Sequence, residues 1–274
     1  MNLRASRVVL RERSLADVLD LAVPFCWANR RPLGVLLVVA ALPIAVLATY
    51  LRVRAHWGWP GLWLLLGVWW LATDGLFTVA FGDLLFTEPR ALVPAAAARR
   101  YLRRLPLLLT TVATRFVVLA LSASVVVGPP YLGPSTLFVQ ECLLLEGASL
   151  GKAWQRSRAL ARNRFGFCLG LSLAALLLPA AGAVVGDQVG DAIVSFVLQM
   201  GRPAGALFTD GGSAFAVLGF LLAVPVAGAA RFLGYINLRT RKEGWDIQLR
   251  FIALAADGGG QPATGARAPS TEAA

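Results

Sequence analysis

The sequence predicts an all-α integral membrane protein. The expected architecture is a polytopic helix bundle of about six transmembrane segments, built as three units of an amphipathic helix plus a transmembrane hairpin. Composition is the first reason, because 57% of the 274 residues are hydrophobic and only 15% are charged, whereas charged residues make up about a quarter of a soluble domain. The second is the presence of uncharged apolar runs of the roughly 20 residues that cross a bilayer. The third is a basic amphipathic segment that precedes such a run three times.

The first unit begins at Ser14, which is followed three residues later by Asp17 in the Ser-x-x-acid pattern of a helix start. Apolar residues at helical spacing follow, so the predicted amphipathic helix covers residues 14–31. Residues 32–51 and 61–86 are the first and second expected spanning helices. The connection between them and the start of the second helix contain tryptophans typical of an interfacial aromatic belt, namely Trp57, Trp59 and Trp63.

The second unit has an expected amphipathic helix at residues 87–104 and a spanning helix at residues 105–128. Prolines then break the chain, and residues 132–146 form a second apolar segment. This segment is short for a span, so two interpretations stay open: it crosses the bilayer, or it re-enters on the side from which it came.

The third unit combines an amphipathic helix at residues 147–164 with a run at residues 165–185 that has no charged side chain. Gly166 and Gly170 in this run predict close contact with another helix. A glycine-rich loop with a small interfacial helix is expected at residues 186–212, and the last spanning helix at residues 213–238.

The three units have equal spacing from the helix start to the closing arginine. The interval is 17 residues in each: Ser14 to Arg31, Thr87 to Arg104 and Gly147 to Arg164. This equality predicts a structural repeat, although any chain of apolar segments flanked by arginines has some repetitive appearance. The basic residues expected at the lipid headgroups are Arg30, Arg31, Arg103, Arg104, Arg156, Arg162 and Arg164.

The distribution of positive charge predicts the topology. If both termini are cytoplasmic and the chain crosses six times, 20 of the 26 Lys and Arg residues lie on the inner side, as the positive-inside rule requires. This count favours a crossing at residues 132–146, and a re-entrant pair that returns inside gives the same result. The expected location is the bacterial inner (cytoplasmic) membrane, with residues 1–255 as one transmembrane domain and residues 256–274 as a disordered tail.

Four ionisable residues fall inside expected spanning segments, where charge is costly unless it is paired. Their depth predicts two pairs, Asp74 with Arg115 and Glu141 with Arg231. These pairs have either a functional role, as a polar pathway for a proton, an ion or a lipid headgroup, or a structural role in fixing helix register.

No enzyme signature is present. The single histidine, His56, lies in a short loop without a nearby nucleophile, and the sequence has neither a nucleophile elbow nor a phosphate-binding glycine loop. The three cysteines have no metal-ligand spacing. We therefore expect no catalytic residue, metal or cofactor, and the net charge of +11 indicates cytoplasmic loops and no nucleic acid partner.

Two motifs carry a resemblance to a family. They are Glu146-Gly147 with Ala153-Trp154-x-Arg156-Ser157, and Tyr235-x-Asn237-x-Arg239-x-Arg241-x-Glu243-Gly244-Trp245-Asp246. Over most of residues 10–250 the chain resembles the bacterial polytopic family named after the membrane domain of glycerophosphoryl diester phosphodiesterases. This family usually has Asp at the position of Asn237. The resemblance implies a six-helix membrane module, often without a catalytic domain, so phosphodiesterase activity is not expected here.

The C-terminal motif carries alternating cations and acids, and we expect Glu243 or Asp246 to bond Arg156; a solvated flank is the alternative. The expected function is that of a non-enzymatic membrane module that organises lipid or a membrane partner, with anionic lipid and a membrane protein as candidate partners. The alternative function is a transporter or channel for a small solute, ion or lipid that uses Asp74, Arg115, Glu141 and Arg231.

Overall fold

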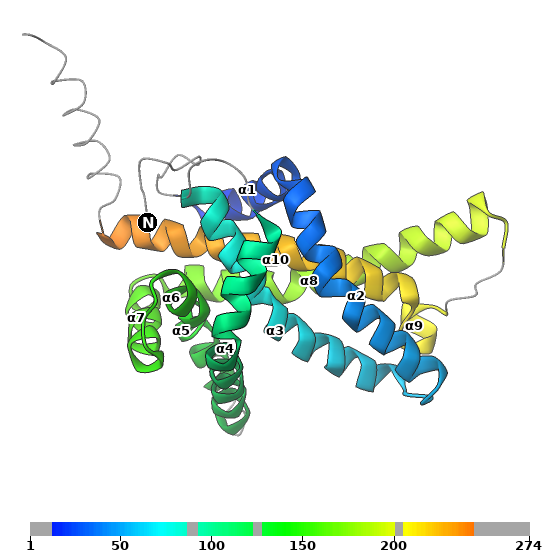
Figure 1. Cartoon of the computed structure of the whole chain (residues 1–274), viewed down its shortest axis with the longest axis horizontal. Helices are drawn as coiled ribbons and strands as arrows, with labels where there is room; N and C mark the ends of the chain where they lie inside the picture. The colour runs from blue at the N-terminus through cyan, green and yellow to red at the C-terminus, as the bar shows by residue number, and fades with distance from the viewer. Residues whose placement is uncertain (1–12, 87–92, 123–127, 201–204, 244–274) are drawn as a thin grey trace, which may run out of the picture.

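A computed structural model describes residues 13–86, 93–122, 128–200 and 205–243 (Figure 1). These ranges form helices and contain no strand. The helices are α1 (Leu15–Ala28), α2 (Arg30–Val53), α3 (Trp59–Phe86), α4 (Pro94–Ser122), α5 (Gly128–Ser135), α6 (Val139–Leu145), α7 (Leu150–Arg162), α8 (Phe165–Ala192), the π-helical turn η2 (Ile193–Val197), α9 (Leu207–Asp210) and α10 (Ala214–Glu243).

Four helical segments are long and apolar enough to cross a membrane: Arg30–Val53, Trp59–Phe86, Phe165–Val197 and Ala214–Lys242. This result agrees with a multi-pass membrane protein. Four of the expected spanning helices correspond to these segments. The expected span at residues 105–128 falls partly outside the described residues, because the side chains at 115, 116 and 118–130 are not described.

Helix α10 is the central element of the fold. It lies lengthwise through the molecule and is contacted by α8, α1, α3 and α2 (Figure 1). The largest fully buried side chains belong to α10, α3 and the segment just before α6: Tyr235, Phe232, Phe77, Phe81 and Phe138. The core is therefore built where these elements meet.

The contact between α8 and α10 depends on glycine. A Cβ atom at Gly182 would lie 2.7 Å from the carbonyl oxygen of Gly219, and one at Gly186 would lie 2.6 Å from that of Phe215. Such distances are too short for any side chain, so the two backbones touch directly in an antiparallel pair. The expected pair is partly wrong: Gly170 faces Leu15 of α1, but nothing lies within 4 Å of a Cβ at Gly166.

Helix α1 begins as the sequence predicts. The Ser14 hydroxyl accepts a hydrogen bond from the Asp17 backbone N–H at 3.2 Å, and the Asp17 carboxylate accepts one from the Ser14 N–H at 3.0 Å. The helix then packs along α10, with the Arg13 backbone bonded to Asn237 at one end and Cys26 against the Pro225 carbonyl at the other. Helix α1 therefore lies along a candidate spanning helix, and its expected position at the headgroups stays a prediction.

The three expected units do not have the same structure. A break separates the amphipathic helix from the spanning helix at Asn29 in the first unit and at Asn163–Arg164 in the third. In the second unit α4 continues through residues 104 and 105 as one helix. The proline that follows, Pro106, lies inside this helix. The second unit therefore lacks the break in the helix that separates the two parts of the other units.

Residues 132–146 do not form one crossing helix, which corrects the favoured prediction. Helices α5 and α6 contain 8 and 7 residues and are separated by a turn. At 1.5 Å per residue each is only about 10–12 Å long, far less than the roughly 30 Å hydrocarbon core. The Arg104 guanidinium of α4 donates a hydrogen bond to the Leu143 carbonyl of α6 at 2.6 Å, so α6 lies beside the start of α4.

The expected loop at residues 186–212 is also shorter than predicted. Helix α8 continues to Ala192 and then through η2 to Val197. The glycines that suggested a loop, Gly186 and Gly190, instead admit α10 to the surface of α8. The predicted small helix in this region is the end of a long helix.

Candidate functional site

The candidate site is a row of polar residues on one face of α10. Arg231, Tyr235 and Arg239 are spaced four residues apart, which places them above one another on a helix. They extend from the buried middle of the helix to its basic end. Each meets a carboxylate or hydroxyl from another element, so the row connects α10 to α3, α6 and the turn after α6.

Arg231 is the centre of the deeper part, which we call the Arg231 network. Its guanidinium forms ion pairs with Asp74 of α3 and Glu141 of α6. It also donates a hydrogen bond from Nη2 to the Thr78 hydroxyl at 3.1 Å. The side chains of Arg231, Asp74 and Glu141 are 8%, 4% and 0% exposed, so the network is closed to the surroundings.

The local sequence explains this geometry. Asp74 and Thr78 are four residues apart and therefore share one face of α3. Opposite them, a Cβ at Gly228 would lie 3.2 Å from an Asp74 carboxylate oxygen, so the glycine lets α10 approach the acid closely. Because a buried charge is costly without a partner, this arrangement fixes the positions of α3, α6 and α10 relative to one another.

Glu146 is the centre of the second part, which we call the Glu146 network. Its carboxylate accepts a hydrogen bond from the Tyr235 hydroxyl and forms an ion pair with Arg156 of α7. Arg239 lies 3.4 Å from the same carboxylate and donates to the Tyr235 oxygen at 3.2 Å. The next residue, Gly147, has φ of 67°, a conformation that favours glycine and turns the chain toward α7.

The structure brings together some of the predicted residues and separates others. Glu141 meets Arg231, as expected, but Asp74 also bonds Arg231. The predicted partner of Asp74, Arg115, has a side chain outside the described set. Arg156 meets Glu146; its predicted partners Glu243 and Asp246 lie outside the described side chains, as do Gly244 and Trp245.

The link from Tyr235 to Glu146 was not predicted, although both residues belong to the motifs of the family resemblance. The spacing of Arg231, Tyr235 and Arg239 was the available signal, because it places one polar face on α10. Another motif residue, Arg241, donates a hydrogen bond to the Arg13 carbonyl at 3.0 Å. It therefore ties the end of α10 to the start of α1.

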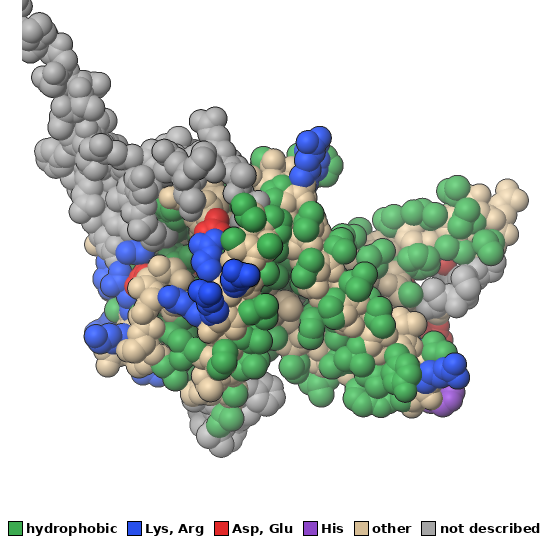
Figure 2. Space-filling view, viewed as in Figure 1, with side chains coloured by type: hydrophobic (Ala, Val, Ile, Leu, Met, Phe, Trp, Pro, Cys, Tyr) green, Lys and Arg blue, Asp and Glu red, His purple; other side chains and the backbone are tan. Residues whose placement is uncertain are grey.

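Basic side chains gather at one end of the molecule, which we call the basic pole (Figure 2). It contains Arg13, Arg239 and Arg241 at the α1–α10 contact, Arg100, Arg103 and Arg104 of α4, and Arg156 of α7. Arg162 and Arg164 are exposed at the end of α7, and Arg30 and Arg31 are exposed at the start of α2. Arg30 lies 5.0 Å from the ring centroid of Trp27.

A cavity of about 390 Å³ opens at the basic pole. Three arginines of α4 line it together with Asp83 of α3 and the end of α6. Arg100 forms an ion pair with Asp83, and Arg104 is held by the Leu143 carbonyl. Arg103 is exposed at the same opening. The cavity thus has more positive than negative charge and polar as well as apolar walls.

The cysteines offer no reactive centre in this region. Cys26, Cys142 and Cys168 are free thiols, the first half-buried and the others buried. Burial raises the pKa of the Cys26 thiol to about 12, so it is protonated at neutral pH. Within the described ranges no three His, Cys, Asp or Glu side chains gather as metal ligands would.

Comparison of the chain with protein-family models, with curated proteins and with solved structures gives no match. The geometry of the two networks and the basic pole is therefore the basis for any functional conclusion.

Proposed function

We propose that this chain is a non-enzymatic module of the bacterial cytoplasmic membrane that binds anionic phospholipid headgroups at its basic pole and organises lipid there. The observation that carries the proposal is the 390 Å³ cavity lined by Arg100, Arg103 and Arg104. A guanidinium has five N–H donors, and the contacts of Arg100 and Arg104 occupy only some of them. Planar guanidinium groups bind phosphate oxygens in bidentate fashion, so a phosphodiester headgroup fits this cavity.

The position of the cavity supports a lipid ligand. It lies at the C-terminal end of α3, a candidate spanning helix, and one wall is formed by the apolar residues Val79, Phe86 and Leu145. Each Lys or Arg near an anionic membrane surface contributes about 1 kcal/mol. The exposed Arg158 and Arg162 of α7 add charge at the same end.

The proposed topology has both termini in the cytoplasm, with the basic pole on that side. Four spanning helices and a re-entrant segment account for the charge distribution without six full crossings. The contact between Arg104 and Leu143 supports this arrangement, because the chain leaves the pole in α4 and is back beside it in α6. The number of crossings is then even, as the positive-inside count requires.

A transporter or channel is the second candidate. Such a protein would need a polar cavity that reaches the Arg231 network. The basic-pole cavity is lined by other residues, and Glu141 is 0% exposed. We therefore assign the Arg231 network a structural role and rank transport below lipid binding.

Lipid retention tests the proposal. The purified chain is titrated in detergent with phosphatidylglycerol and with phosphatidylcholine of the same acyl chains, and bound lipid is counted by native mass spectrometry. We expect the anionic lipid to bind preferentially and Arg103→Gln to weaken it about fivefold, since about 1 kcal/mol is lost.

The control is Arg54→Gln, which removes an exposed arginine at the C-terminal end of α2, outside the cavity, and should leave retention within twofold. Equal binding of the two lipids by the wild type, or equal loss in both variants, would refute a headgroup site at the basic pole.

A further inference from the structure

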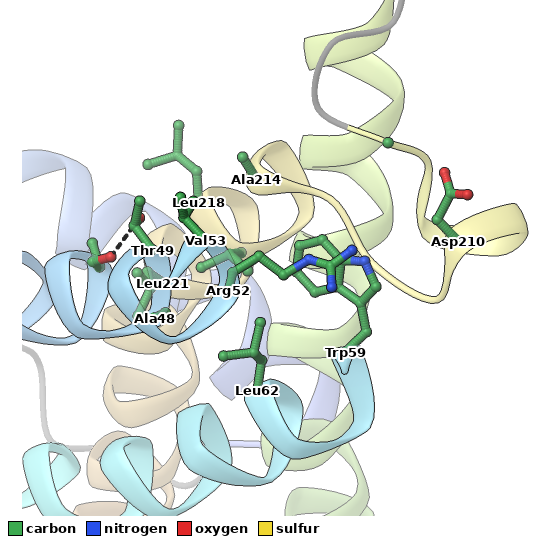
Figure 3. A pocket seen from close by; sticks show the side chains of 13 residues that line it. Ala48, Thr49, Arg52, Val53, Trp59, Leu62, Asp210, Ala214, Leu218 and Leu221 are labelled. Atoms are coloured by element: carbon green, nitrogen blue, oxygen red, sulfur yellow. Dashed lines mark hydrogen bonds between the residues drawn. The ribbon is translucent and has the colours of Figure 1, made fainter. Parts of the chain in front are cut away.

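A second, larger cavity lies at the other end of α3. It has a volume of about 700 Å³, within the roughly 300–1,000 Å³ typical of ligand pockets. Helices α2, α3, α9 and α10 and the segment before α9 form it (Figure 3). We call it the α2–α10 pocket. Trp59 at this pocket and Asp83 at the basic pole are 24 residues apart on α3, about 36 Å at 1.5 Å per residue.

The walls of the α2–α10 pocket are aliphatic. They include Ala45 and Ala48 of α2, Leu62 of α3, and Val217 and Leu221 of α10. From Ala45 to Arg52 the pocket follows α2 for seven residues, or about 10 Å. An apolar slot of this kind, open at the side of a membrane helix bundle, suits a hydrocarbon chain.

The rim of the pocket carries one positive and one negative side chain, Arg52 and Asp210. Arg52 extends across the ring of Trp59, with its guanidinium carbon 5.2 Å from the ring centroid (Figure 3). One of its N–H groups donates to the Trp57 carbonyl at 3.0 Å, which leaves further donors at the opening.

Asp210 is held in place by its own loop. One carboxylate oxygen accepts hydrogen bonds from the Ala206 N–H at 2.8 Å and the Thr209 hydroxyl at 3.3 Å. The loop is anchored on α3, because the Trp63 indole N–H donates to the Gly211 carbonyl at 2.8 Å. Although Arg52 and Asp210 line the same pocket, the described contacts include no ion pair between these two residues.

We propose that the α2–α10 pocket binds an aminophospholipid, a lipid whose headgroup joins a phosphate to a primary ammonium. The acyl chain lies between α2 and α10, the phosphate bonds Arg52, and the ammonium donates to Asp210. Opposite charges at the rim match a zwitterion better than a purely anionic headgroup. A primary ammonium also donates hydrogen bonds to a carboxylate, which a quaternary choline group does not.

The test compares three lipids with identical acyl chains, the probes being phosphatidylethanolamine, phosphatidylcholine and phosphatidylglycerol. Each is titrated into the purified chain, and bound lipid is counted by native mass spectrometry. In the wild type we expect at least fivefold preference for phosphatidylethanolamine over phosphatidylcholine. Asp210→Asn should remove this preference, and Arg52→Gln should weaken both lipids.

Ala48→Trp, which fills the pocket, should lower phosphatidylethanolamine binding at least fivefold. Leu64→Trp is its matched control, because Leu64 is 68% exposed on α3 outside the pocket. Arg103→Gln distinguishes this site from the basic pole, because it should leave the preference for phosphatidylethanolamine over phosphatidylcholine unchanged. If the basic pole does not bind lipid headgroups, the discrepancy would appear only in the retention of phosphatidylglycerol. Equal binding of ethanolamine and choline lipids by the wild type, or no effect of Ala48→Trp in a folded variant, overturns the proposal.

Discussion

The Arg231 network gives the sharpest test of how the fold is held together. The perturbation is Arg231→Gln, which removes the guanidinium and leaves a shorter, uncharged polar side chain. Asp74 and Glu141 then stay buried, 4% and 0% exposed, without the cation that contacts both. Removing one partner of a buried ion pair destabilises a protein by about 3–5 kcal/mol, mainly because the other charge stays buried.

The expected shift in melting temperature follows from this loss. In a domain of about 150–250 residues each kcal/mol lowers Tm by about 2–4 °C, so Arg231→Gln should lower Tm by roughly 6–20 °C. Converting all three ionic residues to amides, with Asp74→Asn, Glu141→Gln and Arg231→Gln together, should restore most of the loss. In that variant no charge stays buried, and amides can still hydrogen-bond one another.

The assay is thermal unfolding in one detergent at one heating rate, followed by tryptophan fluorescence. Arg54→Gln is the matched control, because Arg54 is exposed at the end of α2 and surface substitutions usually change stability by less than about 0.5 kcal/mol. If Arg231→Gln melts within about 2 °C of the wild type, the network is not a structural element. If the triple variant loses as much as the single losses added together, the residues do not act as a unit.

The remaining predictions concern the helix contacts and one thiol. Gly186→Leu should abolish the folded monomer peak in size-exclusion chromatography, because its Cβ would already lie 2.6 Å from the Phe215 carbonyl oxygen. Gly166→Leu is the control and should fold normally, because nothing lies within 4 Å of a Cβ at that position. Equal yields of the two variants would contradict direct backbone contact between α8 and α10. Ser14→Ala should lower stability by about 1 kcal/mol through loss of the cap of α1, seen as a lower Tm, and an unchanged Tm would mean that the cap is not needed. In a chain with Cys142→Ala and Cys168→Ala, Cys26 should react slowly with iodoacetamide at pH 8, and the reaction rate should rise about tenfold per pH unit toward pH 12. The reason is that burial raises the pKa of the Cys26 thiol to about 12 and only the thiolate reacts. A rate that levels off near pH 9 would show an ordinary thiol.

Several features of the fold were predictable because they depend on neighbouring residues alone. The helical class and the apolar character of the four candidate spans follow from runs of local composition. The Ser14–Asp17 cap follows from a three-residue spacing and has the predicted geometry. The pairing of Glu141 with Arg231 was predictable because a buried charge in an apolar helix requires a partner at similar depth.

Other predictions failed where the outcome depends on packing between distant segments. The sequence gives no sign that α4 continues past Arg104 while the other two units break. Gly186 and Gly190 resemble loop residues until α10 is placed against them. The pair of Asp74 with Arg115 stays a prediction, because the Arg115 side chain lies outside the described set. Depth in the helix alone did not show that Asp74 also meets Arg231.

The sequence by itself determined that this chain is a helical protein with apolar segments long enough to cross a membrane and a strong excess of positive charge. These properties are sums over local stretches of chain, since transfer of a segment into hydrocarbon depends on its own length and composition. Only the tertiary structure decided that Arg231 joins Asp74 to Glu141, that Glu146 joins Tyr235 to two arginines, and that two cavities lie at opposite ends of α3. Those contacts require particular faces of distant helices to meet, and that choice depends on close packing between backbones, which no single segment encodes.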